Sequence, residues 1–151
     1  MEHLLPSFER VWTMTDYYDG VRGGIANFSG RPHLYESEWD ERGDEYSSTF
    51  RLYPVSAEVF VAALEDWEIW LRWERAFHEG SVSEDSHPAL PQDRPRHESL
   101  KLILERELQI PNSGYVRALG EFRPVRSRVE GERNLGMLPL QVRWVVVDEN
   151  P

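Results

Sequence analysis

Glu74 and His78 stand one helical turn apart, a spacing at which two side chains can reach the same ion. His87 and His97 follow in the next segment and could add two nitrogen donors. Zinc accepts carboxylate oxygen and imidazole nitrogen, and a zinc-bound water supports hydrolysis. No zinc signature such as His-Glu-x-x-His is present. The four residues define a candidate site for zinc or another divalent metal, in a metal-dependent hydrolase or a small-ligand-binding enzyme.

The alternative for this stretch is structural. Asp66 and Glu74 interrupt the apolar side of a helix. A buried carboxylate needs a partner, because desolvation disfavours the charged form. Arginine side chains or indole N–H groups would then bind both carboxylates, and the histidines would lie in solvent. The missing metal signature favours this alternative, so we expect no cofactor.

A second group of polar and aromatic residues surrounds a predicted Asp-Gly turn. Two carboxylates and two phenols at a strand end could converge on a ligand, and an arginine would bind its anionic part. Paired carboxylates are also what glycoside hydrolysis requires. Alternatively, the tyrosines pack on neighbours and the aspartates stabilise the turn. The candidate ligand-binding residues are Asp16, Tyr17, Tyr18, Asp19, Arg22 and, near the start of the third strand, His33.

Arginines gather late in the chain, at Arg117, Arg123, Arg126, Arg128 and Arg133. They could hold a phosphate or single-stranded nucleic acid, with Tyr115 and Phe122 as stacking partners. Glutamates are interleaved, however, and no Gly-rich phosphate-binding loop is present. The plainer interpretation is that these arginines pair with the acidic segment 36–45 or remain in solvent.

A long helix over residues 56–80 must position the first candidate site. Its apolar residues recur at three- and four-residue steps: Phe60, Leu64, Trp67 and Leu71. Its polar strip contains Glu65, Glu68, Arg72, Arg75 and Glu79. Ser56 can cap the start and Gly80 can end the helix. A helix this apolar must be covered by other elements over most of its circumference.

Alternating apolar and polar residues predict antiparallel strands on both sides of this helix. The expected strands are 11–18, a segment ending near Phe28, 31–39, 46–53, 115–122 and 140–147. Gly23 and Gly24 indicate a bulge or a close backbone approach. The valines at 145–147 indicate burial on both faces. Asp93 can cap a shorter helix over 95–108, after an irregular connection over 81–94, and 124–136 reads as a mobile loop or hairpin end.

The predicted fold is α+β, with a twisted, mainly antiparallel sheet or partly open barrel. An N-terminal four-strand meander and two C-terminal strands form the sheet, which packs on the long Trp-rich central helix and the second, shorter helix. The 151 residues contain no internal repeat and suit one hydrophobic core. We therefore expect a single domain over residues 1–151.

Composition narrows the function classes. The net charge is −10, which disfavours general nucleic-acid binding. Cysteine is absent, so disulfides, Cys-ligated metals and a thiol nucleophile are excluded. No signal peptide or apolar run of membrane-spanning length is visible, and we expect a cytoplasmic protein without a membrane partner.

The charge and the lack of a catalytic motif favour a non-enzymatic, acidic protein-interaction or regulatory module. Such a module would present its acidic face to a protein partner. The sequence specifies neither that partner nor an oligomeric state.

Overall fold

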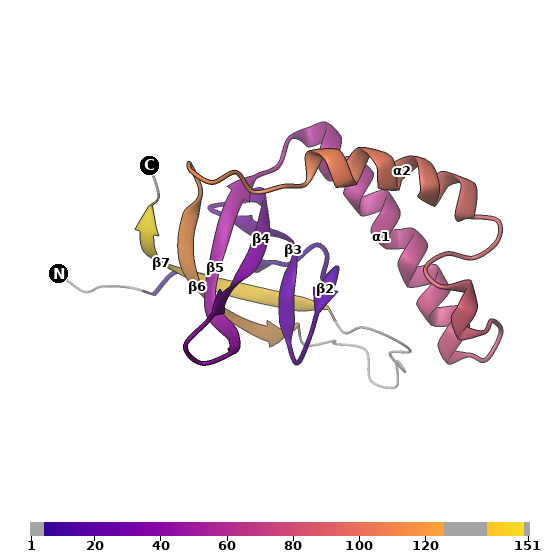
Figure 1. Cartoon of the computed structure of the whole chain (residues 1–151), viewed down its shortest axis with the longest axis horizontal. Helices are drawn as coiled ribbons and strands as arrows, with labels where there is room; N and C mark the ends of the chain where they lie inside the picture. The colour runs from indigo at the N-terminus through magenta and orange to yellow at the C-terminus, as the bar shows by residue number, and fades with distance from the viewer. Residues whose placement is uncertain (1–4, 126–138, 150–151) are drawn as a thin grey trace. The chain divides into compact units, whose positions relative to one another are not determined.

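A computed structural model defines residues 5–125 and 139–149 (Figure 1). Within them the strands form one compact unit and the helices another. The mixed α+β class and the antiparallel sheet are confirmed, and the single domain stays a prediction. The elements are β1 Glu9–Arg10, β2 Asp16–Tyr17, β3 Val21–Phe28, β4 Arg31–Asp40, β5 Glu45–Pro54, α1 Ala57–His78, η1 Glu84–Ser86, α2 Arg94–Glu107, β6 Val116–Pro124 and β7 Leu140–Glu149.

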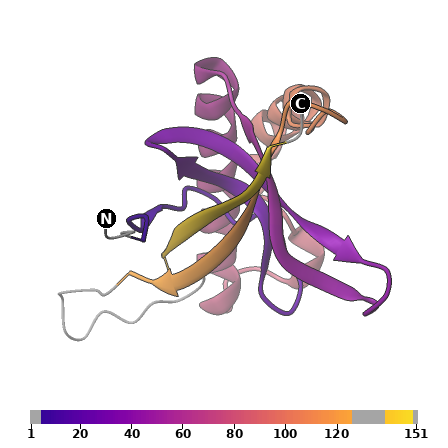
Figure 2. The same ribbon diagram turned by 90° about the vertical axis from the view of Figure 1, so that its left-hand side faces the viewer.

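One antiparallel sheet joins strands from both ends of the chain. Its order is β1-β7-β6-β5-β4-β3-β2, so β6 and β7 extend the N-terminal meander beyond β5. The segment 9–11 bridges two parts of the sheet, because Glu9 of β1 pairs with Val142 of β7 and Val11, which follows β1, forms a bridge with Ala26 of β3. The sheet is therefore curled, and Figure 2 shows how its strands twist across one another.

The predicted strand over residues 11–18 is wrong. Within this range only Asp16–Tyr17 form a strand, β2, and residues 12–15 belong to no strand. The N–H groups of Trp12 and Thr13 both donate to the carbonyl oxygen of Ile25, at 2.8 and 3.0 Å. The Thr13 hydroxyl in turn accepts the N–H of Ile25 at 2.8 Å. These bonds to β3 replace a regular ladder and interrupt the strand.

Four aromatic rings form the centre of the sheet unit. Every pair among them has ring centroids 5.5 to 5.9 Å apart; they are Tyr35, Phe50, Phe122 and Trp144. Gly120 lies against this cluster, and a Cβ there would come within 2.7 Å of the Trp144 ring and 3.0 Å of the Phe50 ring. The close packing of the rings therefore requires a residue without a side chain at position 120.

Tyr35 also carries the polar link between the cluster and the N-terminal segment. Its hydroxyl donates to the carbonyl oxygen of Thr13 at 2.7 Å, and its side chain is fully buried. Burial and, secondarily, Asp16 raise the pKa of the Tyr35 phenol, which therefore remains a donor. Gly24 makes this approach sterically feasible, because a Cβ there would lie 2.2 Å from the same Thr13 oxygen. The expected close backbone approach at Gly23 and Gly24 is thus confirmed at Gly24.

The valines of β7 do not have the predicted burial on both faces. Val145, Val146 and Val147 are 37%, 46% and 49% exposed. In the described residues β1 pairs only with Gln141 and Val142, so the later part of β7 lies beyond its short neighbour. The apolar run belongs to an edge of the sheet and not to its interior.

The helical unit is a pair of antiparallel helices, α1 and α2, which lie side by side in Figure 1. Three ion pairs join α1 to this part of the chain. Glu65 pairs with Arg96 and Asp66 with His97, whereas Arg72, further along α1, pairs with the earlier Asp93 at the N-cap of α2. Ile69, Ala89 and Leu100 form the buried core between them, with Ala62 and Leu104 packed against it. Part of the predicted polar strip of α1 therefore faces α2.

The prediction that the Asp93 side chain caps α2 is wrong. Asp93 occupies the N-cap position, but its carboxylate makes no capping hydrogen bond. Both of its oxygens instead accept hydrogen bonds from the Arg72 guanidinium, at 2.9 and 3.0 Å. A bidentate bond to a cation is stronger than a bond to a neutral N–H, which accounts for the binding of Asp93 to Arg72.

Across the described residues, no helix has both the length and the apolar character needed to cross a membrane.

Replacing Tyr35 by Phe should destabilise the protein, because the buried Thr13 carbonyl then loses its hydroxyl donor. We expect the free energy of unfolding to fall by about 1–3 kcal/mol. Tyr17→Phe removes the same atom from a side chain that is 56% exposed, and should change stability by less than about 0.5 kcal/mol. Urea denaturation followed by tryptophan fluorescence measures both, and equal losses would contradict the role given to the Tyr35 hydroxyl.

Candidate functional site

The turn between β2 and β3 is held by Arg22. Asp19 and Gly20 have positive φ angles, 51° and 121°, which makes the turn tight. The Arg22 guanidinium donates to the carbonyl oxygens of Tyr18 and Asp19, both at 2.8 Å. Arg22 is therefore occupied by the backbone, which argues against its predicted use as an anchor for an anionic ligand.

Tyr46 joins this turn to the neighbouring β4–β5 hairpin. The Arg22 guanidinium carbon lies 5.0 Å from the centre of the Tyr46 ring. The Tyr46 ring is 6.1 Å from that of Tyr18 and 4.9 Å, edge to face, from that of Trp39. Both hairpin ends thus form one continuous surface. We call it the hairpin-end surface; its members are Asp16, Tyr17, Tyr18, Asp19, Arg22, Trp39, Asp40, Glu41, Arg42, Asp44, Glu45 and Tyr46.

This surface combines exposed aromatic rings with negative charge. Tyr17, Tyr18 and Trp39 are 56%, 69% and 49% exposed. Six carboxylates accompany two arginines, and all six are exposed. The structure therefore brings together five of the six predicted ligand-binding residues. Trp39 and Tyr46 were missed, although they end the predicted strands on either side of the acidic loop.

His33 does not join the hairpin-end surface. It pairs with Ala26 near the β3–β4 turn, whereas Asp16 pairs with Gly23 toward the other end of β3. Its ring is 8% exposed, donates from Nδ1 to the Arg31 carbonyl at 2.8 Å, and meets Phe28 edge to face. Burial lowers the pKa of His33, although the bond to the Arg31 carbonyl and the charge of Glu9 oppose the shift.

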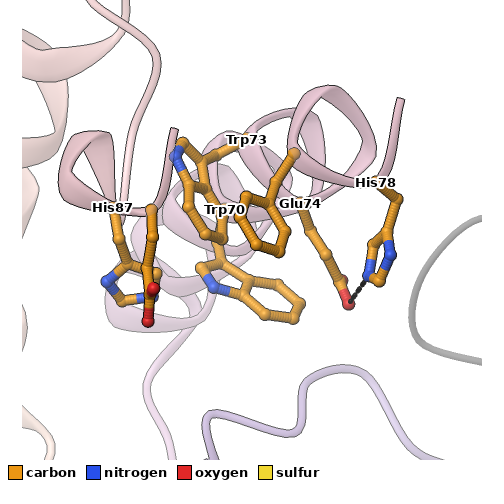
Figure 3. A pocket seen from close by; sticks show the side chains of 7 residues that line it. Trp70, Trp73, Glu74, His78 and His87 are labelled. Carbon is orange, nitrogen blue, oxygen red and sulfur yellow. Dashed lines mark ion pairs between the residues drawn. The ribbon is translucent and has the colours of Figure 1, made fainter. Parts of the chain in front are cut away.

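A pocket of about 530 Å³ lies in the helical unit, between the later part of α1 and the segment that contains η1 (Figure 3). It contains three of the four predicted metal ligands: Glu74, His78 and His87. His97 lies elsewhere, on α2, where its Nδ1 is 2.7 Å from an Asp66 oxygen. The lining residues are Trp70, Trp73, Glu74, Phe77, His78, Glu84 and His87.

Aromatic rings separate the two ends of this pocket. Figure 3 shows Glu74 and His78 together at one side and His87 at the other, with Trp70 and Trp73 between them. A Glu74 oxygen is 3.5 Å from His78 Nε2. The residues the structure describes contain no group of three or more His, Cys, Asp or Glu placed to hold a metal ion.

The pocket walls are held in place by contacts within the unit. The Trp73 indole donates to the Ser86 hydroxyl at 2.8 Å, stacks on Phe77 with centroids 5.1 Å apart, and meets His87 edge to face at 4.7 Å. The Glu74 side chain is only 13% exposed, and its Oε2 atom is buried without a hydrogen-bond partner in the described residues. The pocket therefore presents a desolvated carboxylate beside aromatic rings.

Of the five arginines proposed to bind a phosphate or nucleic acid, the structure describes two, Arg117 and Arg123. Arg117 binds Glu38 through two hydrogen bonds of 2.8 Å, and the bond from Arg117 lowers the pKa of the Glu38 carboxyl. For Arg117 this confirms the expected pairing with segment 36–45. Arg123 lies over the Phe8 ring at 3.5 Å. Arg126, Arg128 and Arg133, and nearly all of the loop predicted over 124–136, lie outside the described residues.

Comparison with known proteins yields no relative for this chain. No protein-family model matches it, and neither does any curated protein or solved structure. What these residues do must be inferred from their own contacts, exposure and charge.

The lowered pKa of His33 should make stability fall as the solution is acidified. The unfolded chain takes up this proton near the ordinary value of about 6.5, whereas the folded state resists it until lower pH. The free energy of unfolding should therefore decrease as pH falls from about 7.5 through 6.5, and level off below the folded pKa. Denaturant titrations measure the slope, which should be flatter in His33→Gln. An NMR titration in which the His33 ring protonates at or above pH 6.5 would contradict this.

Proposed function

We propose that this protein is a non-enzymatic binding module whose hairpin-end surface takes a basic segment of a protein partner. The observation that carries the proposal is the exposure of three large aromatic side chains, Tyr17, Tyr18 and Trp39, among six carboxylates. Isolated exposed apolar residues are normal on a protein surface, but the Tyr18 and Trp39 rings are connected through that of Tyr46, and a connected exposed group marks an interaction site.

The aromatic residues would supply most of the binding energy. Trp and Tyr are the residues that dominate interface hot spots, because they bury a large area at a small cost in side-chain entropy. Trp39 and Tyr18 both contact the ring of Tyr46, which orders them before a partner arrives. Ordering a surface in advance reduces what binding must spend on immobilising side chains.

The carboxylates would select a basic partner and guide it to the surface. Asp40 follows Trp39 in the chain and pairs with Glu45 across the hairpin, and Asp44 lies in the turn between these two residues. Lys and Arg side chains could pair with these carboxylates and lie over the aromatic faces. The position of Arg22 over Tyr46 illustrates this geometry within the chain itself.

The contacts of the surface give less support to a catalytic role. Arg22 donates to backbone carbonyls, and the predicted histidine lies elsewhere on β4. General acid–base catalysis needs a proton donor and acceptor within reach of one substrate position. Carboxylates could fill both roles, as in glycoside hydrolysis, but all six in the described hairpin-end surface are exposed to water and no histidine accompanies them.

Trp39→Ala should weaken binding of a fluorescein-labelled peptide of repeated Lys-Gly-Arg. We expect about a tenfold loss of affinity, typical of a hot-spot residue, measured by fluorescence anisotropy. Val61→Ala is the matched control, because it truncates a 64% exposed residue of α1 and should leave binding unchanged. Equal affinity of wild type and Trp39→Ala would contradict the proposal.

A charge-matched pair of variants separates local recognition from the net charge of the chain. Asp44→Asn with Glu45→Gln removes two carboxylates from the hairpin-end surface. Glu79→Gln with Glu98→Gln removes two exposed carboxylates from the helical unit. The first pair should lower affinity for the same peptide several-fold more than the second at about 0.15 M salt. Equal losses of affinity in the two double variants would mean that the peptide responds only to the net charge of the chain, and would contradict the proposal.

A further inference from the structure

The pocket of the helical unit offers aromatic walls to a ligand. Trp70 stacks on Trp67 with ring centroids 4.8 Å apart, and Trp73 stacks on Phe77. Both tryptophans line the pocket. Its volume of about 530 Å³ lies within the range of small-molecule sites. Indole faces attract methylene groups and, through their quadrupole, cations.

Glu74 specifies the charge and the hydrogen-bonding character of that ligand. Its Oε2 atom is buried and accepts no hydrogen bond from a described residue. A desolvated carboxylate oxygen without a donor is costly, so a ligand that brings a positively charged N–H donor is favoured. A protonated amine supplies both the charge and the donor, whereas a quaternary ammonium supplies only the charge.

A second carboxylate belongs to the opposite end of the pocket. Glu84 lines the pocket and lies in the same turn as His87, whose N–H donates to the Glu84 carbonyl at 3.1 Å. Figure 3 places His87 across the Trp70 and Trp73 rings from Glu74. Two carboxylates with aromatic rings between them match a chain that carries an ammonium group at each end.

We propose that this pocket binds a linear aliphatic diamine or polyamine. One ammonium group pairs with the Glu74 carboxylate, which lines the pocket; the methylene chain lies against Trp70 and Trp73, and the second ammonium group pairs with Glu84. A metal ion fits this arrangement less well, since the aromatic rings lie between the Glu74–His78 pair and His87. The site shares no residue with the hairpin-end surface, so it stands or falls independently of the function proposed above.

Three four-carbon probes test the assignment by isothermal titration calorimetry at constant ionic strength. Putrescine carries two ammonium groups, n-butylamine carries one, and 1,4-butanediol carries none. We expect putrescine to bind about fivefold more tightly than n-butylamine, since Glu84 is exposed and its ion pair is screened. We expect no saturable binding of 1,4-butanediol. Binding of all three with equal affinity, or of none, would overturn the proposal.

Variants assign each ammonium group to its carboxylate. Glu74→Gln should weaken both amines by about tenfold or more, because it removes a charge-assisted hydrogen bond. Glu84→Gln should abolish the advantage of putrescine over n-butylamine and leave n-butylamine binding unchanged. If Glu74→Gln fails to fold, as judged by circular dichroism, the exposed Glu84 variant still decides between support and rejection.

Glu68→Gln controls for attraction of polyamines to an acidic chain. Glu68 is an exposed residue of α1 outside the pocket lining, and its replacement removes one charge from the same helix. Putrescine should bind this variant as it binds wild type, and an equal loss in Glu68→Gln and Glu74→Gln would overturn the site. Stoichiometric binding of zinc chloride that is lost in Glu74→Gln would also overturn the proposal, in favour of a metal site.

Discussion

The bonds that Thr13 makes to two strands hold the N-terminal segment against the sheet. Its hydroxyl and N–H bind Ile25 of β3, and its carbonyl accepts the hydroxyl of Tyr35 on β4. Gly24 allows this approach because it has no Cβ. β2 begins three residues after Thr13, so these hydrogen bonds of Thr13 determine where the β2–β3 turn lies. The hairpin-end surface therefore depends on a buried contact that contains none of its own residues.

The pocket depends on a different constraint, the antiparallel pairing of α1 with the chain that follows it. Bidentate bonds from Arg72 and Arg96 fix α2 along α1, and Ile69 fills the space between them. The bond from Trp73 to Ser86 then fastens the connecting segment to the helix. This irregular connection is longer than most loops, and its contacts give it a defined place beside the later turns of α1.

The local pattern of apolar and polar residues was enough to predict most helices and strands, because the periodicity of each depends on residues close together in the sequence. The bounds of β4, β5 and α1 and the end of β3 follow the predicted ones closely. Pairing between distant residues was harder to foresee. The interruption after β1 depends on hydrogen bonds to Ile25. The position of His97 depends on its bond to Asp66, and the exposure of Val146 depends on the short length of β1. None of these partners is adjacent in the sequence.

Both candidate sites combine carboxylates with aromatic rings, but the carboxylates differ in their access to water. Those of the hairpin-end surface are exposed, so each interacts weakly with a cation and their effect comes from number and from long-range attraction. Glu74 is largely buried, so a single hydrogen bond to it carries more energy and depends more strictly on geometry. Exposed carboxylates therefore suit a flexible basic segment that can shift among several contacts. A recessed carboxylate suits one small cation of defined shape.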